Sequence, residues 1–235
     1  MIRLAGFGVR FDGFTLGPLD LCVEAGERLA VVGPNGAGKS TTMRGMAGRL
    51  ETYDGSANLN GLEVRDAAVA VRGTVGVVAE ELLGFGWMTV SGHLDFLPSF
   101  YATWDRGYAE ELREHLQIPA GTPLAALSKG NRVKLSLVAA EAFRPPVLLL
   151  DEPTSGIDPL MRRRILDLVD RCAPRGGGRT VLFSTHILED LDRIADRVVL
   201  LKDGQVLRDA SLEQLEADSG STPVSEVILK ELADV

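Results

Sequence analysis

The stretch GPNGAGKS, Gly33 to Ser40, constrains the fold of this chain more than any other part of the sequence. It fits the spacing G-x-x-x-x-G-K-[S/T] in full. An apolar run, RLAVV, precedes it, and a helix-compatible run, KSTTMRGMAGRL, begins at Lys39. This order of strand, glycine-rich loop and helix is typical of a nucleotide-binding unit, so we expect an α/β core. A glycine-rich turn with a chance lysine is the alternative, and the flanking pattern disfavours it.

The residues of this loop suit the binding of phosphate. Gly36 and Gly38 let the backbone curl so that successive N–H groups converge on phosphate oxygens, beside the positive end of the following helix. Lys39 brings a positive charge to the β- and γ-phosphates, and Ser40 offers a hydroxyl to Mg²⁺. The predicted nucleotide-binding residues of the loop are Gly33, Pro34, Asn35, Gly36, Ala37, Gly38, Lys39, Ser40 and Thr41.

A second candidate site lies at VLLLDEP, where two acids follow a continuous apolar run. Such a run is expected for a parallel strand covered on both faces, and Asp151 stands at its carboxyl end. A carboxylate there can hold Mg²⁺ directly or through water. Side chains alternate along a strand, so Glu152 is left to face the γ-phosphate and polarise a water. Simple solvated charge is the alternative, and the preceding apolar run makes it the weaker one.

Composition limits the choice of partner. The chain has 235 residues with 45% hydrophobic and 25% charged residues, enough to bury a full core, and a formal net charge of −8. Only Arg162, Arg163 and Arg164 form a short basic run. The surface should therefore repel phosphate backbones, and we expect no nucleic-acid partner.

Cysteine usage and hydropathy indicate a reduced, cytoplasmic setting. Cys22 and Cys172 stand far apart, and we expect both to be small buried hydrophobes rather than a redox pair. No basic start leads into an apolar signal segment. No apolar run reaches the roughly 18 residues that span a bilayer, so any membrane role must go through another chain.

The organisation along the chain is that of a single domain over residues 1–235 with an inserted helical part. Alternating residues such as LDLCVEAGE and the turn from Phe11 to Phe14 predict a small antiparallel sheet near the start. Helical patterns cover residues 89–101, 108–118 and 128–143, the last stopped by Pro145 and Pro146. We also expect a helix capped by Asp158 and a hairpin at RVVLLKDGQVLR. The expected parts are a core of residues 1–79 and 145–210, a helical subdomain of residues 80–144, and C-terminal helices in residues 211–235.

Taken together, these motifs resemble the ATP-binding subunit of an ABC transporter, over essentially the whole chain. The family's order is an adenine-stacking aromatic, a Walker A loop, a Q-loop, a signature beginning LSGGQ, a Walker B strand with a following glutamate, a D-loop and a switch histidine. In this sequence the same order is carried by Phe11, Gly33 to Thr41, the stretch near Glu80, Leu127 to Asn131, Val147 to Glu152, Ser155 to Asp158, and His186. The resemblance implies a P-loop NTPase core with a mixed or parallel sheet, an N-terminal antiparallel β-subdomain and a helical subdomain.

The resemblance also implies a role for LSKGN, which lies far from the phosphate-binding loop. In the family the signature of one subunit closes over the ATP held by the other. Ser128, Lys129, Gly130 and Asn131 would then act across a dimer interface. Ser128 and the N–H of Gly130 open a predicted helix, whose N-terminus suits a γ-phosphate. Taken alone, Ser128 would equally be a simple N-cap.

The role expected for each histidine follows from the predicted element in which it stands. His186 follows an apolar strand, from which its imidazole could hydrogen-bond the γ-phosphate and orient the attacking water. The resemblance makes it the switch histidine and makes Asp158 the D-loop acid. His93 and His115 lie in helical stretches, and we expect both to be structural or surface residues.

Three positions depart from the family pattern. Lys129 replaces a usual glycine and Asn131 a usual glutamine, while Glu80 stands at the Q-loop position, with Glu81 as the neighbouring alternative. Lys129 would add attraction to phosphate. Glu80 would add negative charge beside Asp151 and Glu152. The expected metal ligands are Ser40, Asp151 and Glu80. Phe11 can stack on adenine. The alternative interpretation is that Phe11 is an ordinary core residue.

The leading interpretation is an enzyme, a subunit that uses ATP and Mg²⁺, dimerises on ATP and powers separate transmembrane permease subunits. GWMTVSGHLDF and FYATWD are similar to ATPase subunits that serve separate permeases, often exporters. The partners would be a second ATP-binding subunit and the permease, which would hold the chain at the inner face of the cell membrane. A nucleotide-gated subunit with slow or absent hydrolysis is one alternative, and the retained Glu152 and His186 disfavour it. A soluble ABC ATPase outside transport is another, disfavoured by the single phosphate-binding loop, the acidity and the lack of a heptad array.

Overall fold

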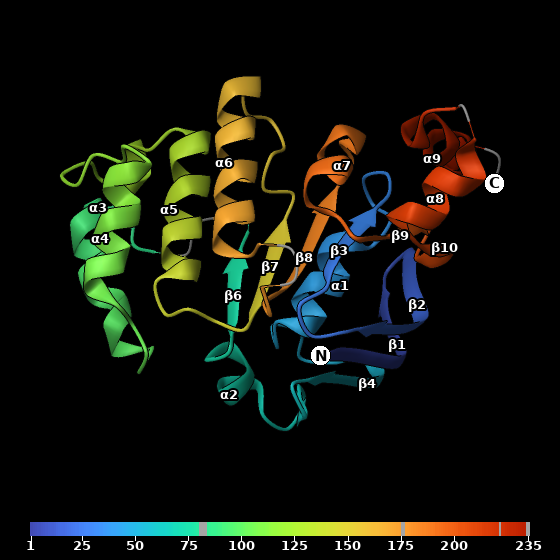
Figure 1. The fold of residues 1–235 in the computed structure, drawn as a ribbon. Coiled ribbons are helices and arrows are strands. Elements are labelled where there is room, and N and C mark those ends of the chain that lie inside the picture. Colours follow the sequence, from blue (N-terminus) through green and yellow to red (C-terminus); the bar gives the residue numbers. More distant parts are fainter. Residues whose placement is uncertain (80–83, 175–176, 221, 234–235) are drawn as a thin grey trace.

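The fold is described from a computed structural model, shown in Figure 1. The structure describes residues 1–79, 84–174, 177–220 and 222–233. Within them the elements form two sheets, one inner helix and an outer set of helices, as the sequence predicts for an α/β chain.

The larger sheet carries the apolar strands expected from the sequence. Its spatial order is β10–β9–β3–β8–β7–β6; β9 to β6 pair in parallel, and β10 pairs antiparallel to β9 at the edge. The predicted hairpin at RVVLLKDGQVLR is confirmed as β9 and β10. The strands are β3 (Arg28–Val32), β6 (Val75–Val78), β7 (Val147–Asp151), β8 (Thr180–Thr185), β9 (Arg197–Lys202) and β10 (Gln205–Ser211).

Both faces of this sheet are buried, which explains its continuous apolar runs. In β7, Leu148 and Leu150 belong to one hydrophobic cluster, while Val147 and Leu149 belong to the other. Because side chains alternate along a strand, a strand covered on both faces needs an apolar residue at every position. The prediction of a buried parallel strand at VLLLD is confirmed.

The smaller sheet is antiparallel, with the order β2–β1–β4–β5. β1 and β2 form the hairpin predicted near the start, with Phe11 opposite Phe14. The sequence analysis did not find β4, which follows the first helix and pairs with β1 from Ile2 opposite Leu59 onward. The strands are β1 (Ile2–Phe11), β2 (Phe14–Val23), β4 (Asp54–Leu59) and β5 (Leu62–Glu63).

The helices divide by position. α1 (Lys39–Met46) lies between the two sheets and contributes Met43 and Met46 to their shared core. Figure 1 shows α3, α4 and α5 beyond the β6 edge of the large sheet, while α8 and α9 lie near its β10 edge. The remaining bounds are α2 (Ala68–Arg72), α3 (Val90–Phe96), α4 (Arg106–His115), α5 (Lys129–Glu141), α6 (Pro159–Cys172), α7 (Leu191–Ile194), α8 (Leu212–Ser219) and α9 (Val224–Ala233), with short 3₁₀ turns η1 (Leu97–Ser99), η2 (Leu124–Ala126) and η3 (Leu188–Asp190).

Helix ends follow the predicted signals. Ser128 caps α5 by accepting a hydrogen bond from Asn131 N, and Asp158 caps α6 by accepting one from Met161 N. Pro159 at the first position of α6 needs no partner for a backbone N–H. α5 ends at Glu141, ahead of the Pro145–Pro146 pair, as expected. None of the helices that the structure describes has both the length and the apolar character needed to cross a membrane.

The prediction for the cysteines is wrong for Cys22, which is exposed. Cys22 lies on β2, where Leu19, Leu21 and Val23 face the core and the alternate residues Asp20 and Cys22 face solvent. In a half-buried antiparallel strand the period of two decides which side a residue takes, whatever its hydrophobicity. Cys172 is half-buried, and both thiols are free.

The two-sided core gives a stability prediction. Leu148→Ala should lower the free energy of unfolding by about 2–5 kcal/mol, because Leu148 is 0% exposed and its neighbours can only partly fill the cavity. Urea denaturation measures this change. Leu229→Ala is the matched control, since Leu229 is 58% exposed on α9 and should change stability by less than about 0.5 kcal/mol. Equal losses in the two variants would contradict the assigned core.

Candidate functional site

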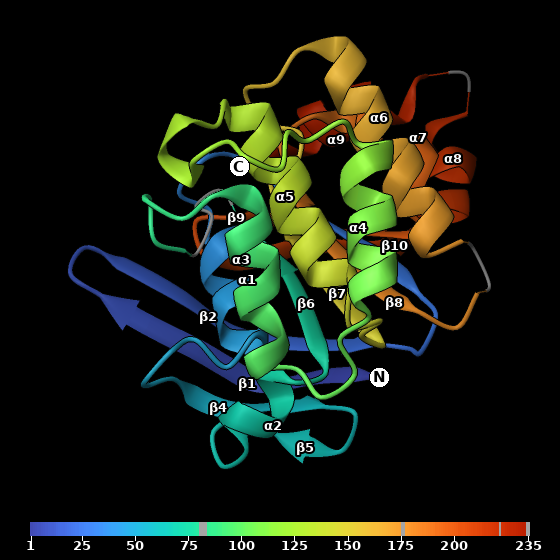
Figure 2. The same cartoon turned by 90° about the vertical axis from the view of Figure 1, so that its left-hand side faces the viewer.

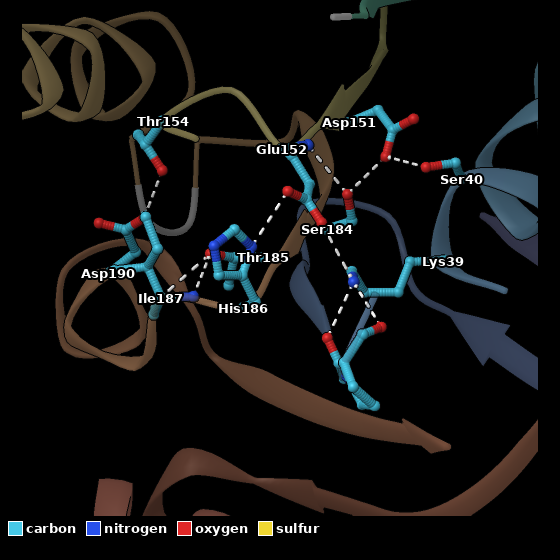
Figure 3. Close-up of polar contacts among 12 residues, drawn as sticks. Lys39, Ser40, Asp151, Glu152, Thr154, Ser184, Thr185, His186, Ile187 and Asp190 are labelled. Atoms are coloured by element: carbon cyan, nitrogen blue, oxygen red, sulfur yellow. Dashed lines mark hydrogen bonds and ion pairs between the residues drawn. The ribbon is translucent and has the colours of Figure 1, made fainter. Parts of the chain in front are cut away.

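The candidate site forms where three parallel strands end together. β3 and β8 pair with Val32 opposite Thr185, and β7 and β8 pair with Asp151 opposite Ser184. The loops that follow these strands therefore emerge at one edge of the sheet, which is where ligands bind in open α/β sheets. Figure 3 shows the side chains that meet there.

The loop from Gly33 to Gly38 needs glycine for steric reasons. A Cβ on Gly33 would lie 2.0 Å from Leu201 O, so β9 leaves no room for a side chain. Gly38 has φ of 105°, a left-handed conformation that favours glycine, and it begins α1. Within the described residues no side chain caps α1. Its first N–H groups and the positive end of its dipole thus face the loop and suit an anion.

Lys39 is held in place by its own loop. Its side chain is 4% exposed, and Nζ donates to Gly33 O at 2.8 Å and to Pro34 O at 3.0 Å. Nζ also pairs with Glu152 Oε1 at 3.1 Å. A buried ammonium group with three oxygen contacts has a fixed position, so its charge is directed at the loop (Figure 3).

Asp151 is joined to two hydroxyl groups. Its Oδ1 accepts hydrogen bonds from Ser40 Oγ at 2.9 Å and from Ser184 Oγ at 2.7 Å. A hydroxyl and a carboxylate oxygen this close fit Mg²⁺, which takes oxygen ligands and often uses one or two protein groups with substrate phosphates. The described residues contain no cluster of three His, Cys, Asp or Glu able to hold a metal alone.

Glu152 turns out of the strand and lies between two basic groups. Its φ of 47° is left-handed, and its N donates to Ser184 Oγ at 2.9 Å. Oε1 faces Lys39, and Oε2 lies 3.0 Å from His186 Nδ1. Burial raises the pKa of Glu152, but the hydrogen bond and charge of Lys39 and the charge of His186 outweigh it, so the pKa is lowered. The carboxyl group is therefore ionised at neutral pH.

Of these groups, Lys39, Ser40, Asp151 and Glu152 line a pocket of about 640 Å³, whereas Ser184 and His186 are not among its lining residues. Its size is within the usual range for a small-molecule site. Phe11 and Phe14 form its aromatic end, and Phe11 is 51% exposed, which excludes the core alternative for this residue. The remaining lining residues are Asn35, Gly36, Gly38, Thr41 and Ser155.

The signature residues Ser128 to Asn131 do not line this pocket in the same chain. They form the cap and first turn of α5, and Gly130 and Lys129 lie beside the D-loop and the first turn of α6. A Cβ on Gly130 would lie 3.5 Å from Met161 Cγ, and one on Gly156 would lie 3.1 Å from Lys129 Nζ. The signature and the D-loop of one chain are thus neighbours, and Asp158 acts locally as the cap of α6.

Other predicted and missed residues can now be placed. Glu80 and its alternative Glu81 lie outside the residues that the structure describes. His93 is buried in α3, and the exposed His115 ends α4, where its Nε2 lies 3.1 Å from Arg171 Nη1.

The sequence analysis missed Ser184 and Phe14. Ser184 carried a signal, since it stands near the end of an apolar strand as Asp151 does.

Comparison with known proteins agrees with this geometry. The model of the ABC transporter family matches residues 16–155, more than half of the chain. The daunorubicin resistance ATP-binding protein DrrA3 of Streptomyces coeruleorubidus is 35% identical over 94% of this chain and 70% of its own length. The phosphate import ATP-binding protein PstB 2 of Natronomonas pharaonis is 32% identical over 98% of this chain and 87% of its own length.

Solved structures give the same result for the fold. An ATP-binding subunit of an ABC transporter superposes with a TM-score of 0.85 at 25% identity, covering 98% of this chain and 99% of its own. The ATP-binding cassette MJ0796, solved as a dimer with ADP and Pi, gives 0.80 at 22% identity over 90% of this chain and 99% of its own.

Fold and pocket together define a P-loop nucleotide-binding cassette. The chain belongs to the ABC transporter family, as one of its ATP-binding subunits with ATPase activity.

The charges around Glu152 give a prediction for its titration. Lys39→Met should raise the pKa of Glu152, because it removes the hydrogen bond and charge that lower it. Carboxyl-carbon NMR of labelled protein measures both values. In the wild type the lowered pKa stabilises the fold above about pH 4.3, the usual glutamate pKa, and this stabilisation is lost as pH falls through the folded value. An unchanged pKa in the variant would show that the ion pair does not form in solution.

Proposed function

We propose that this chain binds ATP with Mg²⁺ in the pocket around Lys39, hydrolyses it in a dimer and powers separate permease subunits. The observation that carries the proposal is the position of Glu152, an ionised carboxylate between Lys39 and His186 at a phosphate-binding loop. General base catalysis needs such a carboxylate within reach of water beside the reacting phosphate.

The nucleotide would lie along the pocket. Phe11 offers an exposed ring for stacking on adenine, next to the half-buried Phe14. The N–H groups of Gly36 to Thr41 and the charge of Lys39 would hold the phosphates. The proposed nucleotide-binding residues are Phe11, Gly33, Pro34, Asn35, Gly36, Ala37, Gly38, Lys39, Ser40 and Thr41.

Ser40 and Asp151 would hold Mg²⁺, which when bound neutralises charge on the phosphates. Ser184 fixes the Asp151 carboxylate by its 2.7 Å hydrogen bond. Glu80 stays a proposed third member of this site.

Hydrolysis would use Glu152 and His186. Glu152 accepts a proton from the attacking water, and His186, hydrogen-bonded to the same carboxylate, orients the carboxylate and the γ-phosphate. The His186 side chain is 41% exposed, so it can meet a ligand at the mouth of the pocket.

The second half of each site would come from another subunit. Ser128, Lys129, Gly130 and Asn131 lie outside their own chain's pocket, and they open α5, whose N-terminus suits a phosphate. The adjacent D-loop with Asp158 would enter the same interface. We therefore assign these residues to the partner's ATP.

The permease would hold the chain at the inner face of the membrane, through the helical subdomain of residues 80–144. We propose that the chain has three parts, a core of residues 1–79 and 145–210, the helical subdomain of residues 80–144, and C-terminal helices in residues 211–235. The direction of transport stays open, because one relative is named for drug resistance and another for phosphate import.

Glu152→Gln should keep ATP binding and stop turnover, because an amide cannot accept the proton of water. A loss of activity of at least about 100-fold is expected from removal of a general base. The ATP-bound dimer should also last longer in size-exclusion chromatography. Wild-type turnover in this variant would rule Glu152 out as the base.

A mixing experiment tests the shared site. Gly130→Asp fits the fold, because its Cβ would meet only Met161 and Ile157 at ordinary distances, but its carboxylate should repel the partner's γ-phosphate. Lys39→Ala should lose most ATP binding, by about 2–3 kcal/mol. Each variant alone should be inactive, and a mixture should regain ATPase activity, since one composite site has both halves intact.

Two outcomes would contradict the shared site. Gly130→Asp could weaken ATP binding to the monomer, or the mixture could stay inactive while light scattering shows that dimers form.

A further inference from the structure

A buried carboxylate that the proposed hydrolysis does not use lies close to the Glu152–His186 pair. Asp190 ends η3, four residues after His186, and is 1% exposed. Its Oδ2 accepts a hydrogen bond from Thr154 Oγ1 at 2.6 Å, and its Oδ1 accepts one from Arg162 Nε at 2.7 Å. Both oxygens are therefore held by short hydrogen bonds, one of them within an ion pair.

The partners of Asp190 come from segments that carry other residues of the site. Thr154 stands two residues after Glu152 and is 1% exposed. Arg162 lies in the first turn of α6, four residues after its N-cap Asp158. α6 and α7 lie side by side, and Asp190 directly precedes α7 (Figure 2). One carboxylate thus joins the segments that follow β7 and β8 to the start of α6.

The strand ladder stops short of the two side chains proposed for hydrolysis. The pairing of β7 with β8 ends at Asp151 and Ser184, so Glu152 and His186 lie beyond the hydrogen bonds that fix the two strands. Their own contact is 3.0 Å long, but the His186 side chain is 41% exposed, and a contact between exposed groups contributes little by itself. The bond from Thr154 to Asp190 gives the two segments a second, buried connection.

The turns on either side of this bond are braced, so they pass its position on. Pro153 follows Glu152, and its ring fixes the φ angle of the short link to the next residue. On the other side, Ile187 N donates to Thr185 Oγ1 at 2.9 Å, which closes a turn around His186. Figure 3 shows the buried hydrogen bond beside these two turns.

We propose that Asp190 is a positioning residue, which holds Glu152 against His186 by way of Thr154 and ties the pair to α6 by way of Arg162. Asp190 does not line the nucleotide pocket, so it acts through these neighbours and not on the phosphates. A carboxylate that only stabilised the core would leave the histidine hydrogen bond and the rate of hydrolysis unchanged when its own bonds are removed. The proposal rests on the proposed role of Glu152 as the base.

Substitutions at Thr154 separate positioning from stability. Thr154→Val keeps the shape of the side chain and removes the hydroxyl group, whereas Thr154→Ser keeps the hydroxyl group. Thr180→Val is the matched control, since Thr180 is 2% exposed at the opposite end of β8, where its hydroxyl accepts a hydrogen bond from Gly26 N at 3.1 Å. Both valine variants lose one buried hydroxyl group, but only Thr154→Val loses the bond to Asp190.

Nitrogen NMR of nucleotide-free, histidine-labelled protein measures the His186 contact directly, and His186→Gln assigns the signal. An ionised carboxylate only accepts hydrogen bonds, so Nδ1 must carry the proton that meets Glu152 Oε2. At about pH 8, where an ordinary histidine is neutral, Nδ1 should be protonated in wild type, Thr154→Ser and Thr180→Val. In Thr154→Val the proton should be distributed over both ring nitrogens, because the carboxylate is no longer held in place.

ATP hydrolysis gives the second measurement. The kcat of Thr154→Val should fall at least about 10-fold, since a misplacement of about 1 Å can cost about 100-fold. Its affinity for ATP should stay that of wild type, because no phosphate-binding residue changes. Thr154→Ser and Thr180→Val should hydrolyse ATP as wild type does. Arg162→Met should also lower kcat, and its exposed neighbour on α6 gives the control Arg163→Met, which should not.

The outcomes separate the two proposals. A wild-type chain without ATPase activity would overturn the proposed function, while the histidine signal still tests how Glu152 is held. An unchanged Nδ1 signal or an unchanged kcat in Thr154→Val would overturn the positioning role, and so would an equal loss of kcat in Thr180→Val. A wild-type rate in Arg162→Met would overturn the tie to α6.

Discussion

The parallel pairing of β3, β8 and β7 is the constraint on which the site depends. Hydrogen bonds along these ladders fix Val32 opposite Thr185 and Ser184 opposite Asp151. A shift of one residue in either pair would turn Asp151 or Ser184 to the other face of the sheet, because side chains alternate. The hydrogen bonds that join Ser40, Asp151 and Ser184 exist only because three strand ends share one register.

Electrostatics then decides what the site can do. Glu152 sits next to two basic groups, and the resulting low pKa keeps it ionised, although partial burial acts in the opposite direction. The same Lys39 that holds this carboxylate is the group that suits a phosphate, so bound nucleotide and Glu152 face one ammonium group. In the proposed function, ligand binding and the position of Glu152 are therefore linked through a single side chain.

α5 joins two regions of this chain. Its N-terminus carries Ser128 and Gly130 beside the D-loop, while Ser136 farther along lines a cavity between β6, α3 and α5. The long apolar contact of α5 with β6 and α4 keeps that element part of the core.

The sequence by itself determined the local features of this protein. The spacing of GPNGAGKS, the apolar run before Asp151 and the capping residues Ser128 and Asp158 each act over a few residues, and the structure has the predicted strand, loop or helix at each. The antiparallel hairpin at Phe11 to Phe14 was predictable for the same reason.

Tertiary structure alone decided which of these features meet. Ser184 binds Asp151 across 33 positions, β4 joins β1, and Arg49, Arg72 and His93 gather around one cavity. Cys22 faces solvent because of the pairing of its strand, which its own hydrophobicity does not reveal. Sequence periodicity reports burial along one element, whereas contacts between distant elements depend on sheet order and register, which are fixed only when the whole core packs.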